Sequence, residues 1–88
     1  LDLELFLASI NSRSKKAFLA KTLDKLSSED LKLLHIYFSC DMSLKKTCEE
    51  TYLHKNTIQY RLNHIHKKCG YNPREFQDAV RLYLALKM

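Results

Sequence analysis

Apolar residues in the segment 55–69 recur with the spacing of an amphipathic helix. They stand at i, i+4, i+7 and i+11, namely at Ile58, Leu62, Ile65 and Cys69. Such a stripe is the face that a helix buries against a protein core. The opposite face carries no acidic residue and is rich in amide and hydroxyl groups. The pattern therefore predicts a long helix with one buried face and one polar face free of negative charge.

A shorter helix is expected just before it, over residues 44–51. Its small or apolar positions are Leu44, Thr47 and Cys48. Ser43 stands where a capping residue is favoured. In the corner at residues 52–54, Leu53 is the only aliphatic side chain, and it is expected to fill the junction between two crossed helices. Two helices joined in this way form a helix-turn-helix, a motif that binds DNA.

The first part of the chain predicts two further amphipathic helices. One covers residues 2–10, with Asp2 as its cap and an apolar face at Leu3, Phe6, Leu7 and Ile10. The other covers residues 15–26, with apolar positions at Phe18, Leu19, Leu23 and Leu26. Residues 1–26 are expected to precede a helix-turn-helix domain at 27–88, either as a linker or as dimer or packing helices. Because the chain begins at Leu1 without a leader, it is expected to be a fragment of something longer.

The remaining segments predict a platform helix and a last helix. Ser27 and Asp30 are spaced as a capping box, and the apolar positions that follow are Leu31, Leu34 and Phe38. Gly70 is expected to end the long helix, because glycine tolerates the left-handed conformation of a helix end. Pro73 suits the first turn of a last helix that runs to about Lys87. Residues 82–86 are apolar nearly all round, so this helix either completes the core or carries a self-association surface.

Composition favours an all-α fold. The chain contains one Gly and one Pro, which leaves few turn signals for hairpins, and its leucines and lysines favour helices. Its 88 residues form one small domain, which buries about 60–65% of its unfolded surface. The expected architecture is a small bundle of five to six helices that contains a helix-turn-helix and no wing.

Positive charge is concentrated in the predicted helix-turn-helix. The formal net charge is +5. Basic and acidic residues cancel over residues 1–30, whereas residues 43–70 carry six basic and two acidic residues. Such an excess is typical of a surface that binds phosphate. Chance clustering on a lysine-rich surface is the alternative.

Several classes of function find no support in the sequence. Cys40, Cys48 and Cys69 follow no pairing or zinc-binding pattern and are expected to be reduced, mostly buried thiols. His64 and His66 point about 200° apart on one helix, so they cannot share a metal ion. No phosphate loop, activated nucleophile or carboxylate pair is visible, and neither an enzyme nor a cofactor is expected. No apolar run approaches the ~20 residues of a membrane span and no signal peptide is visible, which indicates a cytoplasmic protein.

The string HKNTIQYRL at 54–62, followed by Ile65, Gly70, Asp78 and the apolar run at 82–86, resembles the C-terminal helix-turn-helix domain of PucR-type bacterial transcriptional regulators. This group includes regulators of purine catabolism and of sugar-diacid utilisation. The similarity runs from about Ser27 to the end of the chain, and the long helix is also similar to the Fis type, whose short helical domains bind DNA as homodimers. The resemblance implies a wingless C-terminal DNA-binding domain, with any small-molecule effector bound by domains upstream.

Some positions depart from the family pattern. Cys48 replaces the usual Ala and Thr51 the usual Leu, so the first helix of the motif is expected to pack less tightly. Lys55 replaces the usual Arg, which trades a planar fork for a point charge and weakens guanine reading at that position. Gln59 stands where a basic residue is common. The operator sequence of relatives therefore cannot be transferred to this chain.

Ten residues are expected to contact double-stranded DNA. Asn56 and Gln59 are the candidates for base edges, because side-chain amides pair with N6 and N7 of adenine. The alternatives for them are a solvated helix face or, for Asn56, a helix cap. The other candidates, for bases or phosphates, are Lys45, Lys46, His54, Lys55, Thr57, Tyr60, Asn63 and Lys67. Arg61 lies nearer the buried stripe and is expected to pair with Glu49 or Glu50 instead.

The expected function is sequence-specific DNA binding by a homodimer, since two half-sites about 34 Å apart require two copies. A helical protein-interaction or dimerisation module is the alternative, because an amphipathic bundle with an apolar last helix also suits a partner helix.

Overall fold

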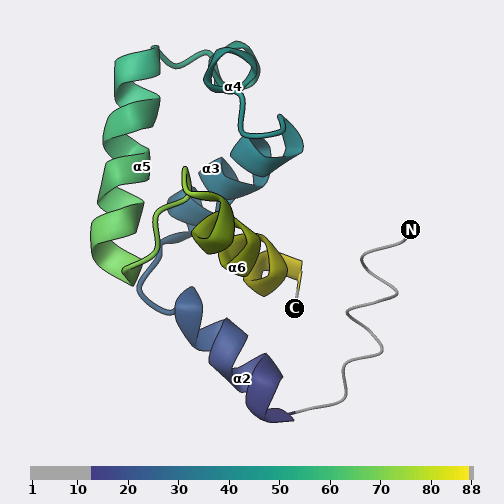
Figure 1. The fold of residues 1–88 in the computed structure, drawn as a ribbon. Coiled ribbons are helices and arrows are strands. Elements are labelled where there is room, and N and C mark those ends of the chain that lie inside the picture. Colours follow the sequence, from purple (N-terminus) through teal and green to yellow (C-terminus); the bar gives the residue numbers. More distant parts are fainter. Residues whose placement is uncertain (1–12, 88) are drawn as a thin grey trace.

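The computed structural model of the chain describes residues 13–87, which form five α-helices and no strand. The helices are α2 (Arg13–Thr22), α3 (Ser28–Ser39), α4 (Leu44–Thr51), α5 (Lys55–Cys69) and α6 (Phe76–Lys87) (Figure 1). The all-helical class is confirmed. The helix expected at 2–10 lies outside the described residues. Among the described helices, none combines the length and apolar character that a membrane span requires.

One apolar core joins α3, α5 and α6. Its members are Leu33, Leu34, Tyr37, Ile58, Leu62, Ile65 and Leu82. Full burial of an aliphatic side chain of this size contributes about 1.5–3 kcal/mol, so the three members from α5 attach that helix firmly to the bundle. α4 packs against α3 and α5, and α2 packs against α6. α5 lies along one side of the bundle, which leaves its outer face open (Figure 1).

α3 begins with the predicted capping box but buries a different stripe. The Ser27 hydroxyl accepts a hydrogen bond from the Asp30 amide at 3.1 Å, and the Asp30 carboxylate accepts one from the Ser27 amide at 3.0 Å. Of the predicted apolar positions, Leu34 is fully buried, Phe38 is half-buried and packs against the core, and Leu31 is half-buried. The fully buried apolar positions are Leu33, Leu34 and Tyr37. The stripe is displaced because α3 packs against both α4 and α6.

α2 ends earlier than the predicted boundary at residue 26. Its last residue is Thr22, and residues 23–25 form a turn. In this turn the amide of Leu23 donates to the carbonyl of Ala20 at 3.1 Å, and the amide of Leu26 donates to the carbonyl of Leu23 at 3.0 Å. Bonds between residues three apart tighten the last turn of a helix, and here they redirect the chain towards α3.

The prediction that Pro73 lies in the first turn of the last helix is wrong, because α6 begins at Phe76. Residues 72–75 form a separate turn. The Asn72 side chain accepts a hydrogen bond from the Arg74 amide at 3.0 Å, and the Asn72 carbonyl accepts one from the Glu75 amide at 3.1 Å. Pro73, the second residue of this turn, has a completely buried side chain.

α6 has one buried face and one exposed apolar patch. Ala79, Leu82 and Ala85 are buried. Phe76 and Val80, by contrast, are 77% and 39% exposed. The helix therefore completes the core with one face and leaves an apolar surface at its N-terminal end.

Candidate nucleic-acid interface

Short-range hydrogen bonds shape α4 and the corner that follows it. The Ser43 hydroxyl accepts a hydrogen bond from the Lys46 amide at 3.2 Å and caps α4 as predicted. The chain leaves α4 through Tyr52, whose backbone is left-handed with φ at 59° and whose amide donates to the Cys48 carbonyl at 2.9 Å. Leu53 then turns inward and packs against the core. The corner between the two helices is therefore short and tightly bonded.

His54 caps α5. Its Nδ1 accepts a hydrogen bond from the Asn56 amide at 3.1 Å. Asn56 is therefore not the cap, and its exposed side chain makes no hydrogen bond to the described residues. At the other end, Gly70 takes the left-handed conformation with φ at 83° and closes the helix, as the sequence predicts.

The two faces of α5 differ completely in exposure. Ile58, Leu62 and Ile65 are each at most 1% exposed. On the opposite side every position is exposed, and the central stripe consists of Asn56, Tyr60, Asn63 and Lys67. The helix contains neither Asp nor Glu. α5 therefore presents a polar outer face without negative charge.

All ten residues predicted to contact DNA are exposed. Two belong to α4, one caps α5 and seven belong to α5; they are Lys45, Lys46, His54, Lys55, Asn56, Thr57, Gln59, Tyr60, Asn63 and Lys67. None forms an ion pair within the described part of the chain. The structure brings Lys45, His54 and Lys55 together around one groove, whereas Asn63 and Lys67 lie farther along α5. No acidic residue of the described part of the chain therefore forms an ion pair with these four lysines.

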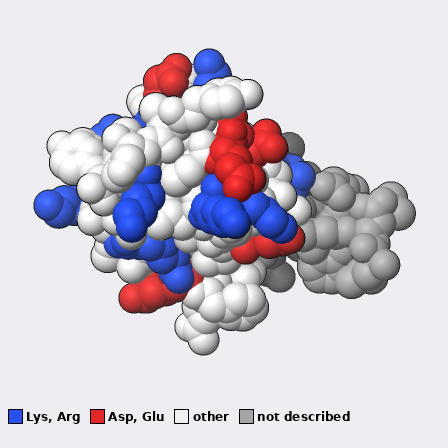
Figure 2. Space-filling model, turned by 90° about the horizontal axis from the view of Figure 1, so that it is seen from above, with Lys and Arg blue, Asp and Glu red and all other residues white. Residues whose placement is uncertain are grey.

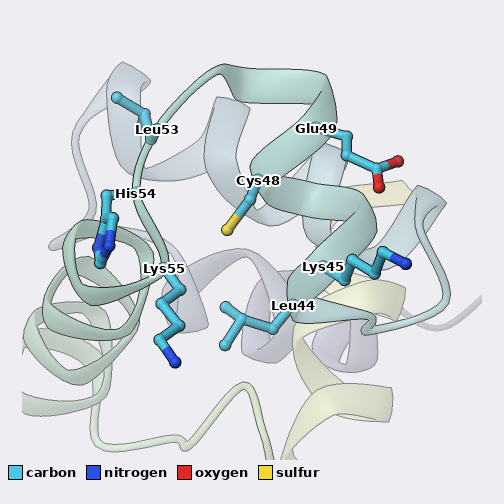
Figure 3. Close-up of a pocket in the computed structure, with 7 residues that line it drawn as sticks. All are labelled: Leu44, Lys45, Cys48, Glu49, Leu53, His54 and Lys55. Carbon is cyan, nitrogen blue, oxygen red and sulfur yellow. The ribbon is translucent and has the colours of Figure 1, made fainter.

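A groove of about 650 Å³ lies between α4 and the start of α5. The side chains of Leu44, Cys48 and Lys55 point into it, while Lys45 and Glu49 turn towards the outer side of α4 (Figure 3). Viewed from the end of the molecule where α4 lies, Lys and Arg side chains are spread over this face, and Asp and Glu side chains lie among them at several places (Figure 2). The groove thus combines an apolar floor with a rim that carries two lysines, a histidine and one acidic residue, Glu49.

Two polar contacts anchor the inner side of α5 to the beginning of α3. Lys68 Nζ lies 2.8 Å from Asp30 Oδ2. The Arg61 guanidinium donates to the backbone carbonyl of Glu29 at 3.1 Å. The predicted pairing of Arg61 with Glu49 or Glu50 is therefore wrong, because the side chain turns towards α3 and not towards α4.

Asp30 is held in its charged form by these contacts. Burial raises the pKa of its carboxyl group, but hydrogen bonds from Lys68 and from the backbone and side chain of Ser27 outweigh burial and leave the pKa below that of a free aspartate. The carboxylate therefore remains ionised at neutral pH and serves the cap of α3 and the anchor of α5 together.

Two residues near the outer face of α5 were not identified from the sequence. Arg74, in the turn before α6, donates a hydrogen bond from its guanidinium to the side-chain oxygen of Asn63. His64 stacks on Tyr60 with ring centroids 6.0 Å apart. The spacing i, i+4 gives a signal for the second contact, but no local pattern indicates the first, since Arg74 lies eleven residues beyond Asn63.

The cysteines are free thiols with no arrangement for metal binding. Cys40 is buried, and Cys48 and Cys69 are half-buried. Burial raises the pKa of the Cys69 thiol, which keeps it protonated and weakly nucleophilic at neutral pH. Within residues 13–87, no three His, Cys, Asp or Glu side chains gather to hold a metal ion.

Relatives of this chain are bacterial regulators. It is 33% identical over 79 residues to the purine catabolism regulatory protein of Bacillus subtilis (strain 168), with 83% of this chain and 15% of that protein covered. It is 32% identical over 76 residues to the proline-responsive transcriptional activator PutR of the same organism, with 85% of this chain and 18% of that protein covered. It is 29% identical over 93 residues to the carbohydrate diacid regulator of Escherichia coli (strain K12), with 100% of this chain and 24% of that protein covered.

The chain spans at most about a quarter of the length of these relatives. No solved structure gives a significant match to it. The sequence model of the PucR C-terminal helix-turn-helix domain matches residues 31–88, which include α4, the corner and α5, and the chain therefore belongs to this family of transcriptional-regulator domains.

Proposed function

We propose that this chain binds double-stranded DNA sequence-specifically, as the C-terminal domain of a longer bacterial transcriptional regulator, with α5 in the major groove. The observation that carries this proposal is the exposed, acid-free outer face of α5 directly opposite its buried stripe. A major groove admits one α-helix, and its base edges offer hydrogen-bond donors and acceptors to the side chains of that helix. Since bacterial DNA lies in the cytoplasm, the regulator acts there.

Within this complex the residues have distinct roles. Asn56 and Gln59 read base edges, and Lys55, Tyr60 and Asn63 contact bases or phosphates beside them. His54 and Thr57 meet phosphate at the N-terminal end of α5, where backbone amides and the helix dipole favour an anion. Lys45, Lys46 and Lys67 neutralise phosphates along the flanks. His54 retains Nε2 for this contact, because only Nδ1 is used in the cap.

The domain works as a homodimer that reads two half-sites about 34 Å apart, one turn of the duplex. The exposed apolar patch of Phe76 and Val80 on α6 supports self-association, and upstream parts of the regulator contribute as well. Any effector binds in those upstream parts, which make up most of the length of the relatives.

Fluorescence anisotropy with a labelled duplex from upstream of the chain's own gene, against a scrambled duplex over a salt series, tests the proposal. We expect tighter binding to the first duplex and a steep fall in affinity with salt. The variant Asn56→Ala/Gln59→Ala should lose the preference while keeping its helical content. Gln77→Ala, which removes an exposed amide from α6, is the matched control and should bind as the wild type does. Failure of both duplexes to bind at low salt, even with two copies joined covalently, would refute the proposal.

A protein-interaction module is the second candidate, favoured by the exposure of Phe76 at 77%. If partner binding through α6 is the activity, Phe76→Ser should abolish it, and Asn56→Ala/Gln59→Ala should have no effect. The two sets of variants therefore separate the two functions.

A further inference from the structure

Arg74 is held beside α5 by a rigidly built turn. Its backbone amide donates to the side-chain oxygen of Asn72 at 3.0 Å, and the Asn72 amide donates to the Asp78 carboxylate at 3.0 Å. Pro73, between them, is completely buried. These contacts fix the backbone on both sides of Arg74, so its side chain reaches Asn63 from a defined position. A side chain held in this way is preorganised for binding.

The charge of Arg74 has no acidic partner within the described residues. The ion pairs of this part of the chain involve Lys32 and Lys68, and the hydrogen bond of the Arg74 guanidinium goes to the neutral amide oxygen of Asn63. A guanidinium carries five N–H donors. Most of them therefore remain available on the exposed side, next to the outer stripe of α5.

The contact with Arg74 determines what Asn63 offers to a base. An asparagine that pairs with adenine uses both its oxygen, which accepts from N6, and its nitrogen, which donates to N7. In the exposed Asn63 the oxygen accepts from Arg74, whereas no described residue accepts a hydrogen bond from its amide N–H groups. Together with the remaining guanidinium N–H groups, they make this surface rich in hydrogen-bond donors, with one lone pair of the Asn63 oxygen as its remaining acceptor.

We infer that Asn63 and Arg74 act as one unit that selects guanine in the major groove, an inference that rests on the proposed DNA-binding function. Guanine presents two acceptors there, O6 and N7, whereas adenine presents one acceptor and the N6 donor. A surface rich in donors matches the two acceptors of guanine better than the acceptor and donor of adenine. Arg74 thereby becomes a specificity-determining residue outside the helix-turn-helix itself.

Asn56 provides the contrast within the same stripe. Its side chain makes no hydrogen bond to residues 13–87, so it keeps both groups that adenine requires. Asn63 lies seven positions further along the helix, and at about 1.5 Å per residue this is a distance of about 10 Å. At about 3.4 Å per base step, this distance corresponds to about three base pairs. Each half-site should therefore contain an adenine and, about three base pairs away, a guanine.

Selection of duplexes from a library with a randomised core, followed by affinity measurements on the selected site, tests the inference. With the wild type we expect both bases at this spacing. Arg74→Ala and Asn63→Ala should each lose the guanine preference, a loss of roughly 5- to 150-fold in discrimination, whereas Asn56→Ala should lose only the adenine preference. Replacing that guanine by 7-deazaguanine should weaken wild-type binding, and replacing it by inosine should not, because inosine keeps O6 and N7.

Arg74→Lys distinguishes base reading from phosphate binding. The lysine keeps the charge but lacks the planar fork, so the salt dependence should stay unchanged while the guanine preference falls. The inference is overturned if Arg74→Ala weakens all duplexes equally with a salt slope smaller by about one, or if the guanine preference survives in that variant. If the wild type binds no duplex in the library even with two copies joined covalently, the proposed function fails, and this inference fails with it.

Discussion

Lys68 on α5 and Asp30 on α3 form an ion pair whose atoms lie 2.8 Å apart, and the same carboxylate oxygen accepts a hydrogen bond from the amide of Ser27 at the start of α3. One carboxylate therefore closes the cap of α3 and holds the far end of α5. The orientation of α5 and the integrity of α3 are coupled through this group.

Lys68→Met should destabilise the fold without removing a DNA contact. The side chains of Lys68 and Asp30 are 33% and 10% exposed, and loss of a charged partner in such a site costs about 1–3 kcal/mol. Urea denaturation followed by circular dichroism measures the loss. Lys67→Met, one position away and on the exposed face, is the control and should change the free energy of unfolding by less than about 0.5 kcal/mol. Equal effects of the two changes would show that the ion pair does not stabilise the fold.

The stability of the domain should decrease in acid because of Asp30. The pKa of this residue is lower in the folded chain than in a free aspartate, so the unfolded state binds the proton more tightly. The contribution is complete at neutral pH, starts to fall as the pH approaches about 4, the pKa of an unfolded aspartate, and is lost as the pH passes through the folded value. Asp30→Asn removes the group that titrates. The difference in unfolding free energy between wild type and variant should therefore shrink from pH 7 to pH 3, and a constant difference would contradict the assignment.

Gly70→Ala should destabilise through the backbone alone. Gly70 has φ at +83°, and a Cβ added there would meet no atom within 4 Å. An L-residue in the left-handed region costs about 1–2 kcal/mol, and no steric clash adds to this cost. Gly70→Asn should cost less, since asparagine tolerates this region better. If alanine and asparagine are equally harmless in thermal denaturation, the helix ends differently in solution.

Lys67→Ala should reduce the salt dependence of DNA binding. Each phosphate that a lysine neutralises contributes about one to the slope of log K against log salt. Lys25→Ala removes an exposed lysine from the turn after α2, outside the proposed interface, and should leave the slope unchanged. The outcome that contradicts the proposed surface is a smaller slope for Lys25→Ala than for Lys67→Ala.

The elements that local patterns encode were predicted well. The bounds of α4 and α5, the caps at Ser43 and Gly70, and the buried stripe of α5 all follow from residues within one or two helical turns of each other. The ten proposed DNA contacts were predicted as exposed positions for the same reason, because a buried stripe implies its opposite face.

The features that depend on distant residues were not predicted. Arg61 contacts Glu29 across 32 positions of sequence, so periodicity on α5 gave no indication of its partner. The start of α6 moves to Phe76 because Pro73 is buried by the rest of the fold, although proline alone favours the first turn of a helix. The contact of Arg74 with Asn63 is not predictable from the sequence, because it depends on the path of the turn between α5 and α6.

The separation of the two faces of α5 has a consequence for how this domain evolves. Substitutions at the inward positions Ile58, Leu62 and Ile65 are penalised by the fold. Asn56, Tyr60, Asn63 and Lys67 are exposed, and among them only Tyr60 and Asn63 contact side chains of the described residues, namely His64 and Arg74. Under the proposed function, a duplicated copy of this domain can therefore acquire a new operator through a few outward substitutions while its core stays unchanged. The residues of α5 that preserve the fold are therefore different from those that would change the preferred DNA sequence.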